Sequence, residues 1–478
     1  MNDLFLVIDQ GGQSTRVAVF DRTGKMICLD SSLCATQIIN IENHQQHIEQ
    51  NPHEILDGMT SSFNKIVEQL GVDVKRIKSA GFSGQGSSLL CWNNKTGEAL
   101  TPVLSWQDTR AKDYLQQLNI SQEEIQKITG LRISPHYGAS KIRWCLDQSS
   151  EVQDARGKNQ LSIGPIVSFI LWHLAGYKNQ VDPGHAQRTL LWNMQTANWD
   201  KTLLDLFAIP QTLLPQCLFH QDNFGKLKLA NHSIDFRVCA RDQGASLFAL
   251  GMPDKQAAYI NIGTGAFIQR IHQDKKPPEG VLVSPLWISE DHQSDLFAWE
   301  ATVNGAAAAI PYIEQVTGLK ITPELIDQAL LQPLGTDDFF INTQGGLGAP
   351  FWRTDIESRF SNELSPIQQV AAWLESIMFL LLVNLQKMNA DNWLTQIQLS
   401  GGFSRSDKFC QRLANLCQLP LVVTENPEAS LQGIAYLTSG CSSTWEPSSE
   451  KKIIKPQVQD LLHKRFQYWL NKLQSVLS

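Results

Sequence analysis

The chain has 478 residues, of which 42% are hydrophobic, and a formal net charge of -7 at pH 7. This length suits two domains of roughly 200 residues or more, each with its own core. The acidic balance and the scarcity of Lys/Arg runs argue against a nucleic-acid footprint and an anionic membrane surface. We therefore expect a small-molecule ligand, and neither a nucleic-acid nor a membrane partner.

The cysteines and the N-terminal segment indicate a cytoplasmic protein. Nine cysteines are scattered without a C-x-x-C pair, and Asp3 and Asp9 lie where a signal peptide would need a basic start and an apolar stretch. The most apolar run, Met378 to Val383, is much shorter than the roughly 18 residues that cross a bilayer. The oligomeric state stays open, with a homodimer among the options.

The first predicted element is a glycine hairpin. An apolar strand from Leu4 to Asp9 leads into Gly11-Gly12, and a second strand runs back from Arg16 to Asp21. Bare backbone N–H groups at such a turn can approach phosphate oxygens, and the carboxylate of Asp9 can hold a hydrated Mg²⁺. Taken alone, however, a Gly-rich turn between two strands is usually only a turn.

Helices and strands alternate after this hairpin. Asn51-Pro52 predicts a helix from about Pro52 to Leu70, because Asn caps helices and Pro is tolerated in their first turn. A buried strand from Ile77 to Phe82 leads into a polar, glycine-containing loop, and another strand runs from Leu89 to Asn93. This mixture indicates a layered α/β domain whose ligands gather at loops beyond the strand ends.

A domain boundary is predicted near Arg241 to Gly244. These residues interrupt a short strand, Phe236 to Cys239, and a helix of small residues from Ala245 to Leu250 is expected to follow. The sequence thus predicts an N-terminal domain of residues 1–244 and a C-terminal domain of residues 245–478.

The second half repeats the layout of the first. Another glycine hairpin, Asn261 to Phe267, is followed by a long helix that Ser365-Pro366 opens and that ends near Met388. A strand, Ile397 to Leu399, then leads into Gly401-Gly402. The last residues, 451–478, space their leucines like one face of a packed helix.

Five motifs in this order and spacing resemble the FGGY carbohydrate kinases, and most of all their glycerol kinase branch. They are Asp9-Gln10-Gly11, Ser105-Trp106-Gln107-Asp108-Thr109-Arg110, Arg241-Asp242-Gln243, Gly263-Thr264-Gly265-Ala266-Phe267 and Ser400-Gly401-Gly402. The resemblance spans nearly the whole chain. It implies an actin-like α/β fold, with two ribonuclease-H-like domains flanking a cleft that binds ATP and Mg²⁺.

By this resemblance, Asp242 is the catalytic base that accepts the proton of the substrate hydroxyl, and Asp9 and Asp242 are the metal ligands. Phosphoryl transfer depends mainly on positioning and charge neutralisation, which suits one placed carboxylate and a metal ion. The alternative is that Asp242 is a turn residue paired with Arg241. The family usually has a small residue before this Asp, and we expect the guanidinium of Arg241 to face solvent.

The resemblance also implies an ATP site drawn from both halves of the chain. Gly12 stands where the glycerol kinases have a hydroxyl residue, so one hydrogen bond to the γ-phosphate is expected to be missing. For Phe403 and Asp407 the alternative is core packing and turn chemistry. The full expected set is Gly11, Gly12, Gln13, Ser14, Arg16, Gly263, Thr264, Gly265, Gly305, Gly401, Gly402, Phe403 and Asp407.

The expected substrate residues divide into matches and departures. Those that match the glycerol kinases are Trp106, Gln243 and Phe267, with Gln85 beside them, and those that replace the branch's Arg-Glu pair and its Tyr are Gly86, Ser87 and His136. A site that loses charged and bidentate donors loses the hydrogen bonds that select its ligand, and a glycine leaves space near the reacting hydroxyl. Glycerol is therefore a doubtful substrate.

The sequence thus predicts an ATP-dependent kinase that phosphorylates a primary hydroxyl of a small neutral polyol or ketose sugar. One alternative is a true glycerol kinase with a remodelled pocket. Another is a nucleotide-dependent binding or regulatory protein without sugar chemistry.

Overall fold

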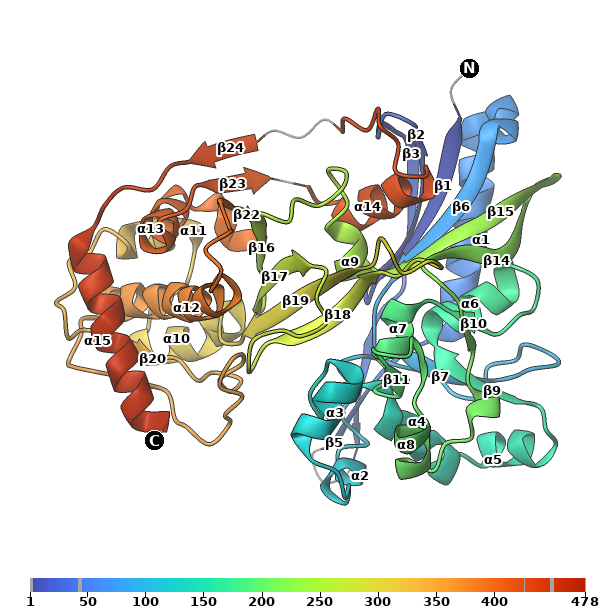
Figure 1. Cartoon of the computed structure of the whole chain (residues 1–478), viewed down its shortest axis with the longest axis horizontal. Coiled ribbons are helices and arrows are strands. Elements are labelled where there is room, and N and C mark those ends of the chain that lie inside the picture. Colours follow the sequence, from blue (N-terminus) through green and yellow to red (C-terminus); the bar gives the residue numbers. More distant parts are fainter. Residues whose placement is uncertain (1–2, 42–44, 425, 448–450, 478) are drawn as a thin grey trace. The chain divides into compact units, whose positions relative to one another are not determined.

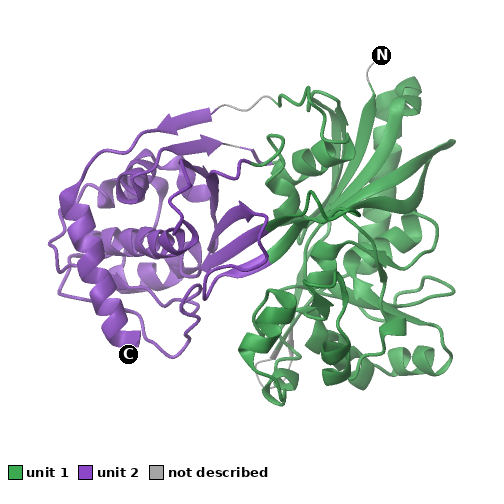
Figure 2. Ribbon diagram, viewed as in Figure 1, with its two compact units in different colours: residues 1–253, 284–297, 428–448 green, residues 254–283, 298–427, 449–478 purple. Residues whose placement is uncertain are grey.

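The computed structural model of the chain describes residues 3–41, 45–424, 426–447 and 451–477. They form two compact units that do not follow the two halves of the sequence (Figure 2). Unit 1 contains residues 1–253, 284–297 and 428–448, whereas unit 2 contains residues 254–283, 298–427 and 449–478. The expected boundary at residue 244 thus differs from these units, because the chain passes between them more than once.

The main sheet of unit 1 has six strands. Their order is β14 (Gln221–Leu229), β15 (His232–Arg241), β6 (Ile77–Gly84), β1 (Leu4–Gln10), β2 (Ser14–Asp21) and β3 (Met26–Leu33) (Figure 1). β1, β2 and β3 pair antiparallel, whereas β6 runs parallel to β1 and β15 runs parallel to β6. Helix α1 (Pro52–Leu70) covers β2 and β3, and α14 (Ala429–Thr438) contacts β1 and β6.

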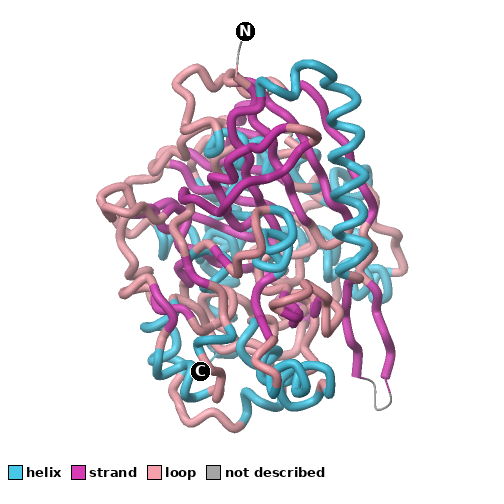
Figure 3. The backbone as a smooth tube through the Cα atoms, turned by 90° about the vertical axis from the view of Figure 1, so that its right-hand side faces the viewer, coloured by secondary structure: helices cyan, strands magenta, loops and turns pink. Residues whose placement is uncertain are grey.

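Unit 1 also contains a second sheet, which has five strands. Its order is β4 (Gln37–Ile41), β5 (Gln45–Gln50), β8 (Val103–Leu104), β7 (Leu89–Asn93) and β9 (Leu161–Pro165), and β4 and β5 form the long projecting hairpin of Figure 3. The smaller elements of this unit are η2 (Gly71–Arg76), α2 (Asp113–Gln116), α3 (Gln122–Thr129), α4 (Gly138–Gln148), α5 (Ser150–Gly157), α6 (Ile166–Leu174), β10 (Gln180–Val181), α7 (Pro183–Gln187), β11 (Trp192–Asn193), β12 (Asn198–Trp199), α8 (Lys201–Leu206), η3 (Gln211–Leu213), β13 (Gln216–Cys217) and α9 (Asp242–Ser246).

The sheet centred on unit 2 repeats the pairing of the first. Its order is β18 (Leu282–Trp287), β19 (Leu296–Val303), β17 (Ala266–His272), β16 (Ala257–Ile262), β22 (Gln396–Ser400), β23 (Leu421–Thr424) and β24 (Lys451–Ile454). β16 pairs antiparallel with β17 and parallel with β22, as β1 does with β2 and β6. The other elements are η4 (Ala307–Ala309), α10 (Ile310–Thr317), α11 (Pro323–Ala329), β20 (Phe340–Ile341), β21 (Arg359–Phe360), α12 (Pro366–Met388), η5 (Gly402–Arg405), α13 (Asp407–Cys417) and α15 (Asp460–Leu477).

Several predicted elements are confirmed, and two differ. The terminal helix expected over residues 451–478 is shorter, because residues 451–454 form strand β24 and α15 begins only at Asp460. α1 begins at Pro52 after Asn51, whose side chain accepts from the backbone N–H of His53, and α12 begins at Pro366. The helix expected at 245–250 instead begins at Asp242, because β15 continues its ladder with β6 as far as Arg241. This shift places Asp242 at the junction of a strand and a helix.

Helix α12 is long and apolar enough to cross a membrane by length and composition, the one such helix among the described residues. However, 78% of its most apolar window is buried inside the protein. It therefore serves as a core helix, with Trp373 fully buried on it.

Candidate active site

The first glycine hairpin joins β1 to β2. The backbone N–H of Gly11 donates to the carbonyl of Ser14 at 2.9 Å, and that of Gln85 donates to the carbonyl of Gln10 at 2.9 Å. A Cβ added at Gly11 or Gly12 would meet no atom nearer than 3.5 Å or 3.8 Å, respectively. Since packing within the protein does not require these glycines, the space beside the turn is open to a ligand.

Asp9 lies at the centre of a polar cluster beside this hairpin. Its buried carboxylate accepts from Ser83 and, at 2.9 Å, from the hydroxyl of Ser430, and it forms an ion pair with Arg16. Arg16 also pairs with Glu428 at 2.5 Å. Arg16, expected to handle phosphate, is thus held by two carboxylates, one of them from the segment that precedes α14.

Asp242 is the first residue of α9 and is partly buried. Burial and the negative charge of Asp9 raise its pKa to about 6, although Arg241, the backbone N–H of Gln243 and His185 each act to lower it. The N–H of Gln243 donates to its Oδ1 at 2.7 Å. A carboxylate with a pKa close to neutrality is suited to take up a proton in a reaction.

Arg241 does not face solvent, which corrects the sequence-based expectation. It is 6% exposed, and its Nη1 donates to Oε1 of Gln243 at 3.0 Å. A Cβ added at Gly86 would lie 2.7 Å from Cδ of Arg241 and 3.2 Å from Cγ of Arg188. The absence of a side chain at Gly86 was expected to leave space for a ligand. The aliphatic parts of Arg188 and Arg241 instead fill the space directly beside Gly86.

Trp106 and His136 are joined by a contact between the imidazole of His136 and the main chain of Trp106. Trp106 is 45% exposed, and its backbone N–H donates to the hydroxyl of Ser88 at 2.9 Å. The Nδ1 of His136 lies 3.1 Å from the carbonyl of Trp106, so this nitrogen carries the proton and donates. Burial lowers the pKa of His136 below its ordinary value. The neutral imidazole then has a second nitrogen that can accept from a hydroxyl group.

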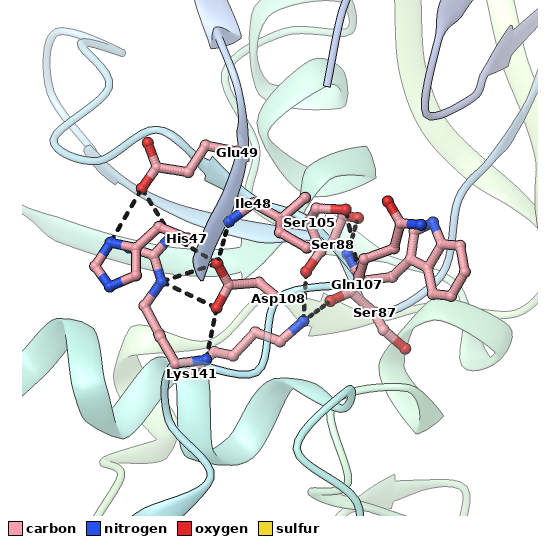
Figure 4. A network of polar contacts seen from close by, with 11 residues as sticks. His47, Ile48, Glu49, Ser87, Ser88, Ser105, Gln107, Asp108 and Lys141 are labelled. Atoms are coloured by element: carbon pink, nitrogen blue, oxygen red, sulfur yellow. Dashed lines mark hydrogen bonds and ion pairs between the residues drawn. The ribbon is translucent and has the colours of Figure 1, made fainter. Parts of the chain in front are cut away.

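A buried ion-pair cluster supports the loop that carries Trp106 (Figure 4). Asp108 accepts from the backbone N–H of Ile48 at 2.7 Å and pairs with Arg110 at 2.6 Å, and Arg110 in turn pairs with Glu49 at 2.7 Å. These contacts hold the motif 105–110 against β5. They leave Arg110 in a structural position rather than at a ligand.

Gln85 is also engaged within the protein. Its side chain is buried, and its amide nitrogen donates to Oε1 of Gln50 at 2.5 Å. Gln50 itself donates to the carbonyl of Gly12 at 3.1 Å. Gln85 therefore supports the hairpin at this point, whereas Gln243 is exposed at the surface of unit 1.

The second glycine hairpin, which lies in unit 2, is held by backbone hydrogen bonds. The carbonyls of Gly263 and Thr264 accept from the backbone N–H groups of Ala307 and Ala308, at 3.2 Å and 2.8 Å. Gly401 has φ 95, and a side chain there would overlap the backbone of Ile262, the last residue of β16. The two glycine turns of this unit therefore lie side by side, as the resemblance implies for a nucleotide site.

The remaining expected residues of unit 2 differ in exposure. Gly305 has φ 66, and its carbonyl accepts from the indole of Trp373 at 3.1 Å. Phe403 is 5% exposed and packs on Phe409 with ring centroids 5.3 Å apart, so its ring belongs to the core. Asp407 pairs with Lys452 on β24. Phe267, expected at the substrate, is 37% exposed.

A metal site was expected at Asp9 and Asp242. Among the residues that the structure describes, no group of three or more His, Cys, Asp or Glu side chains could hold a metal ion. Two carboxylates fit Mg²⁺, because this ion usually takes one or two carboxylates and completes its shell with phosphates and water.

Several residues of the site escaped the sequence interpretation. They are Ser83, Lys141, His185, Arg188, Glu428 and Ser430. His185 is buried, with Nδ1 at 2.6 Å from Asp182 and Nε2 at 3.1 Å from the carbonyl of Gly84. No spacing signal marks them, since most approach the site from elements distant in sequence.

Family models match both halves of this chain. The FGGY family of carbohydrate kinases, N-terminal domain, matches residues 4–248, and the C-terminal domain of the same family matches residues 258–439. A glycerol kinase of Xanthomonas campestris pv. campestris (strain 8004) is 27% identical over 471 residues, which cover 95% of this chain and 92% of that protein. One of Aquifex aeolicus (strain VF5) is 26% identical over 455 residues, 93% of this chain and 90% of that protein.

Solved structures show the same fold. The glycerol kinase of Plasmodium falciparum with ADP has a TM-score of 0.87 at 21% identity, and the gluconate kinase of Lactobacillus acidophilus has 0.84 at 20% identity. Each comparison covers 100% of this chain and 99% of the other. The expected actin-like α/β fold and the family resemblance are therefore confirmed. None of these comparisons supports a binding protein without enzymatic activity.

Proposed function

Because the chain belongs to the FGGY family of carbohydrate kinases, we propose that it transfers the γ-phosphate of ATP to a primary hydroxyl of a small neutral polyol or ketose. Its class, a phosphotransferase with an alcohol group as acceptor, follows from the family and from the glycerol kinases that match most of its length. The cytoplasmic location and the oligomeric state stay predictions.

The observation that carries this proposal is the environment of Asp242. Its carboxylate has a raised pKa, lies within reach of the charge of Asp9 and begins a helix beside the proposed substrate residue Gln243. In the reaction, Asp242 accepts the proton of the attacking hydroxyl as its oxygen bonds to the γ-phosphorus, while the bond from that phosphorus to the bridging oxygen breaks and ADP leaves. A positioned base of this kind contributes about 10²–10⁴-fold to a rate.

The proposed nucleotide residues act mainly through their backbones. The backbone N–H of Gly12 and the hydroxyl of Thr264 are donors suited to phosphate oxygens, whereas the N–H of Gly11 is used within the turn. Phe403 would contribute through its backbone, because its ring is buried. Mg²⁺, when bound by Asp9 and Asp242, would neutralise charge on the phosphates.

The proposed acceptor face consists of Trp106, His136, Ser87 and Gln243. The exposed indole can cover the C–H face of a polyol, while the imidazole and the amide can bond to its hydroxyls. These four residues include no acidic side chain, lysine or arginine, so the face suits a neutral ligand. We propose that four- and five-carbon acceptors are preferred over glycerol.

A glycerol kinase with a remodelled pocket is the second candidate. The observation in its favour is the packing at Gly86, where Arg188 and Arg241 fill space that a longer ligand would otherwise use. The glycerol kinases among the relatives cover nearly all of this chain, which agrees with this candidate too.

The test is steady-state kinetics of ADP formation with glycerol, erythritol, D-xylulose, D-ribulose and L-ribulose under identical ATP and Mg²⁺. We expect a polyol or ketose of four or five carbons to give a higher kcat/KM than glycerol. Lost charged hydrogen bonds cost about 1.5–3 kcal/mol each, so a difference of about tenfold or more is expected. Glycerol as the best acceptor would establish the second candidate, and ADP formation with none of them would refute both.

A further inference from the structure

Lys141, on helix α4, lies behind two loops that carry proposed acceptor residues. Its side chain is fully buried, and its Nζ donates to the carbonyl of Ser105 at 2.7 Å and to that of Ser87 at 3.2 Å (Figure 4). One ammonium group thus joins the loop after β6 to the loop after β8. Neither loop is next to α4 in the sequence.

Each of these carbonyls adjoins the proposed acceptor face. Ser105 precedes Trp106, and Ser87, with φ 66, holds a left-handed conformation that is uncommon for a residue with a side chain. The same loops have a second, neutral connection, since the N–H of Trp106 donates to the hydroxyl of Ser88 at 2.9 Å. The charged and the neutral connection together fix where the indole lies relative to the turn at Ser87.

A buried ammonium group is costly unless hydrogen bonds or opposite charges compensate. An apolar side chain of similar length would avoid this cost, so packing alone gives no reason for a lysine here. Asp108 supplies the opposite charge nearby, and the two carbonyls supply the acceptors. The lysine is therefore accounted for by the bonds that it makes to the two loops.

We propose that Lys141 is a positioning residue that fixes loop 85–88 against loop 105–107 and thereby sets the geometry of the acceptor face. It acts through Trp106 and Ser87 and does not touch the reacting atoms. The role of this face in binding an acceptor rests on the proposed function. The hydrogen bonds from Lys141 to the two loops do not depend on that function. Displacement of a binding group by an ångström can cost about 10²-fold in rate.

The connection should weaken on the alkaline side of neutrality. Burial lowers the pKa of Lys141 to about 7, with Arg110 acting in the same direction and Asp108 and Cys145 acting against it. As the pH rises through this value the group loses its charge, and charge-assisted hydrogen bonds are roughly twice as strong as neutral ones. His136, which also faces Lys141, has a lowered pKa and is already neutral in this range.

The test compares Lys141→Met with Lys141→Arg in the full chain. For Lys141→Met we expect the KM of the best acceptor to rise at least about tenfold, within the ~10²-fold cost of misplacement, while the KM of ATP is unchanged. Hydrogen exchange should accelerate in segments 85–88 and 105–107 and not in α1. Lys141→Arg should restore most of the affinity and remove the rise of the wild-type acceptor KM above pH 7.

An unchanged acceptor KM together with unchanged exchange would overturn the inference. So would equal increases in both KM values or faster exchange throughout unit 1, because these indicate a general loss of structure. If Lys141→Met does not fold, the wild-type chain decides: a loss of exchange protection in segments 85–88 and 105–107, but not in α1, as the pH rises through about 7 supports the inference, and unchanged protection overturns it. Exchange reports on the connection even if wild-type protein phosphorylates no acceptor, so the two failures are distinguishable.

Discussion

At the scale of single residues, the proposed chemistry depends on the pKa of Asp242, which its surroundings in the protein raise above the value in water. An aspartate in solution is ionised above about pH 4. Here burial and the charge of Asp9 outweigh the opposing effects of Arg241 and His185, and the pKa rises to about 6. Arg241 thus moderates the shift without cancelling it, although it is the neighbour in sequence.

This shift predicts the acid side of the pH profile. The base acts in its ionised form, and a raised pKa means that the proton is retained at higher pH, so kcat/KM should fall as the pH drops through about 6. Initial rates between pH 4.5 and 8 measure this. Samples returned from low pH to neutrality must recover full activity, which excludes unfolding. A kcat/KM that does not fall between pH 7 and pH 4.5 would contradict the raised pKa of Asp242.

Two glycines of unit 1 make a matched pair of substitutions. A Cβ at Gly86 would lie 2.7 Å from a buried arginine stem, whereas one at Gly12 meets nothing nearer than 3.8 Å. We expect Gly86→Ala to raise the acceptor KM by about tenfold, through displacement of Arg241 next to Gln243. Gly12→Ala should change the acceptor KM by no more than about twofold, because the added methyl group displaces no side chain near the acceptor residues. Equal effects of the two substitutions would contradict the role given to Gly86.

At the scale of elements, α14 and α9 connect distant parts of the sequence to one site. α14 contacts α9, β1 and β6, and the segment at its start carries Glu428 and Ser430 to Arg16 and Asp9. The two helices approach so closely that a side chain at Gly433 would overlap the carbonyl of Ala245. Asp242 opens the helix on which this carbonyl lies.

Gly433→Ala should therefore affect stability and rate together. Overpacking against a backbone costs about 1–3 kcal/mol, and displacement of α9 moves the base. We expect Tm to fall by about 2–8 °C by scanning calorimetry, with a lower kcat. The control is Gly157→Ala at the end of α5, where an added Cβ meets no atom within 4 Å. If both variants keep wild-type Tm, the close approach of α14 and α9 is not as described.

Elements with strong local signals could be predicted from the sequence. α1 and α12 have a capping residue followed by Pro, and β1 begins with the continuous apolar run Leu4 to Ile8, so their positions follow from local chemistry. The end of β15 could not be predicted in this way. Its ladder with β6 extends to Arg241, and this pairing is set by a strand far away in the sequence.

At the scale of the whole chain, the order of motifs predicted the family, and the repeated pairing of the two sheets agrees with it. The path of the chain was not predictable, because segments 284–297 and 428–448 return to unit 1 through contacts without a local signature. The same holds for the site. Its glycine turns and Asp242 were expected from motifs, whereas the burial of Arg241 and the role of Lys141 depend on tertiary packing.

The measurement that tests the central claim most directly is the rate of ADP formation by Asp242→Asn with the best acceptor, together with its affinity for ATP. The amide fills the same volume but cannot accept the hydroxyl proton. We predict that the rate falls by about 10²–10⁴-fold while ATP binds with nearly the wild-type Kd. A variant that retains most of the wild-type rate would contradict the account, because the proton would then be accepted elsewhere.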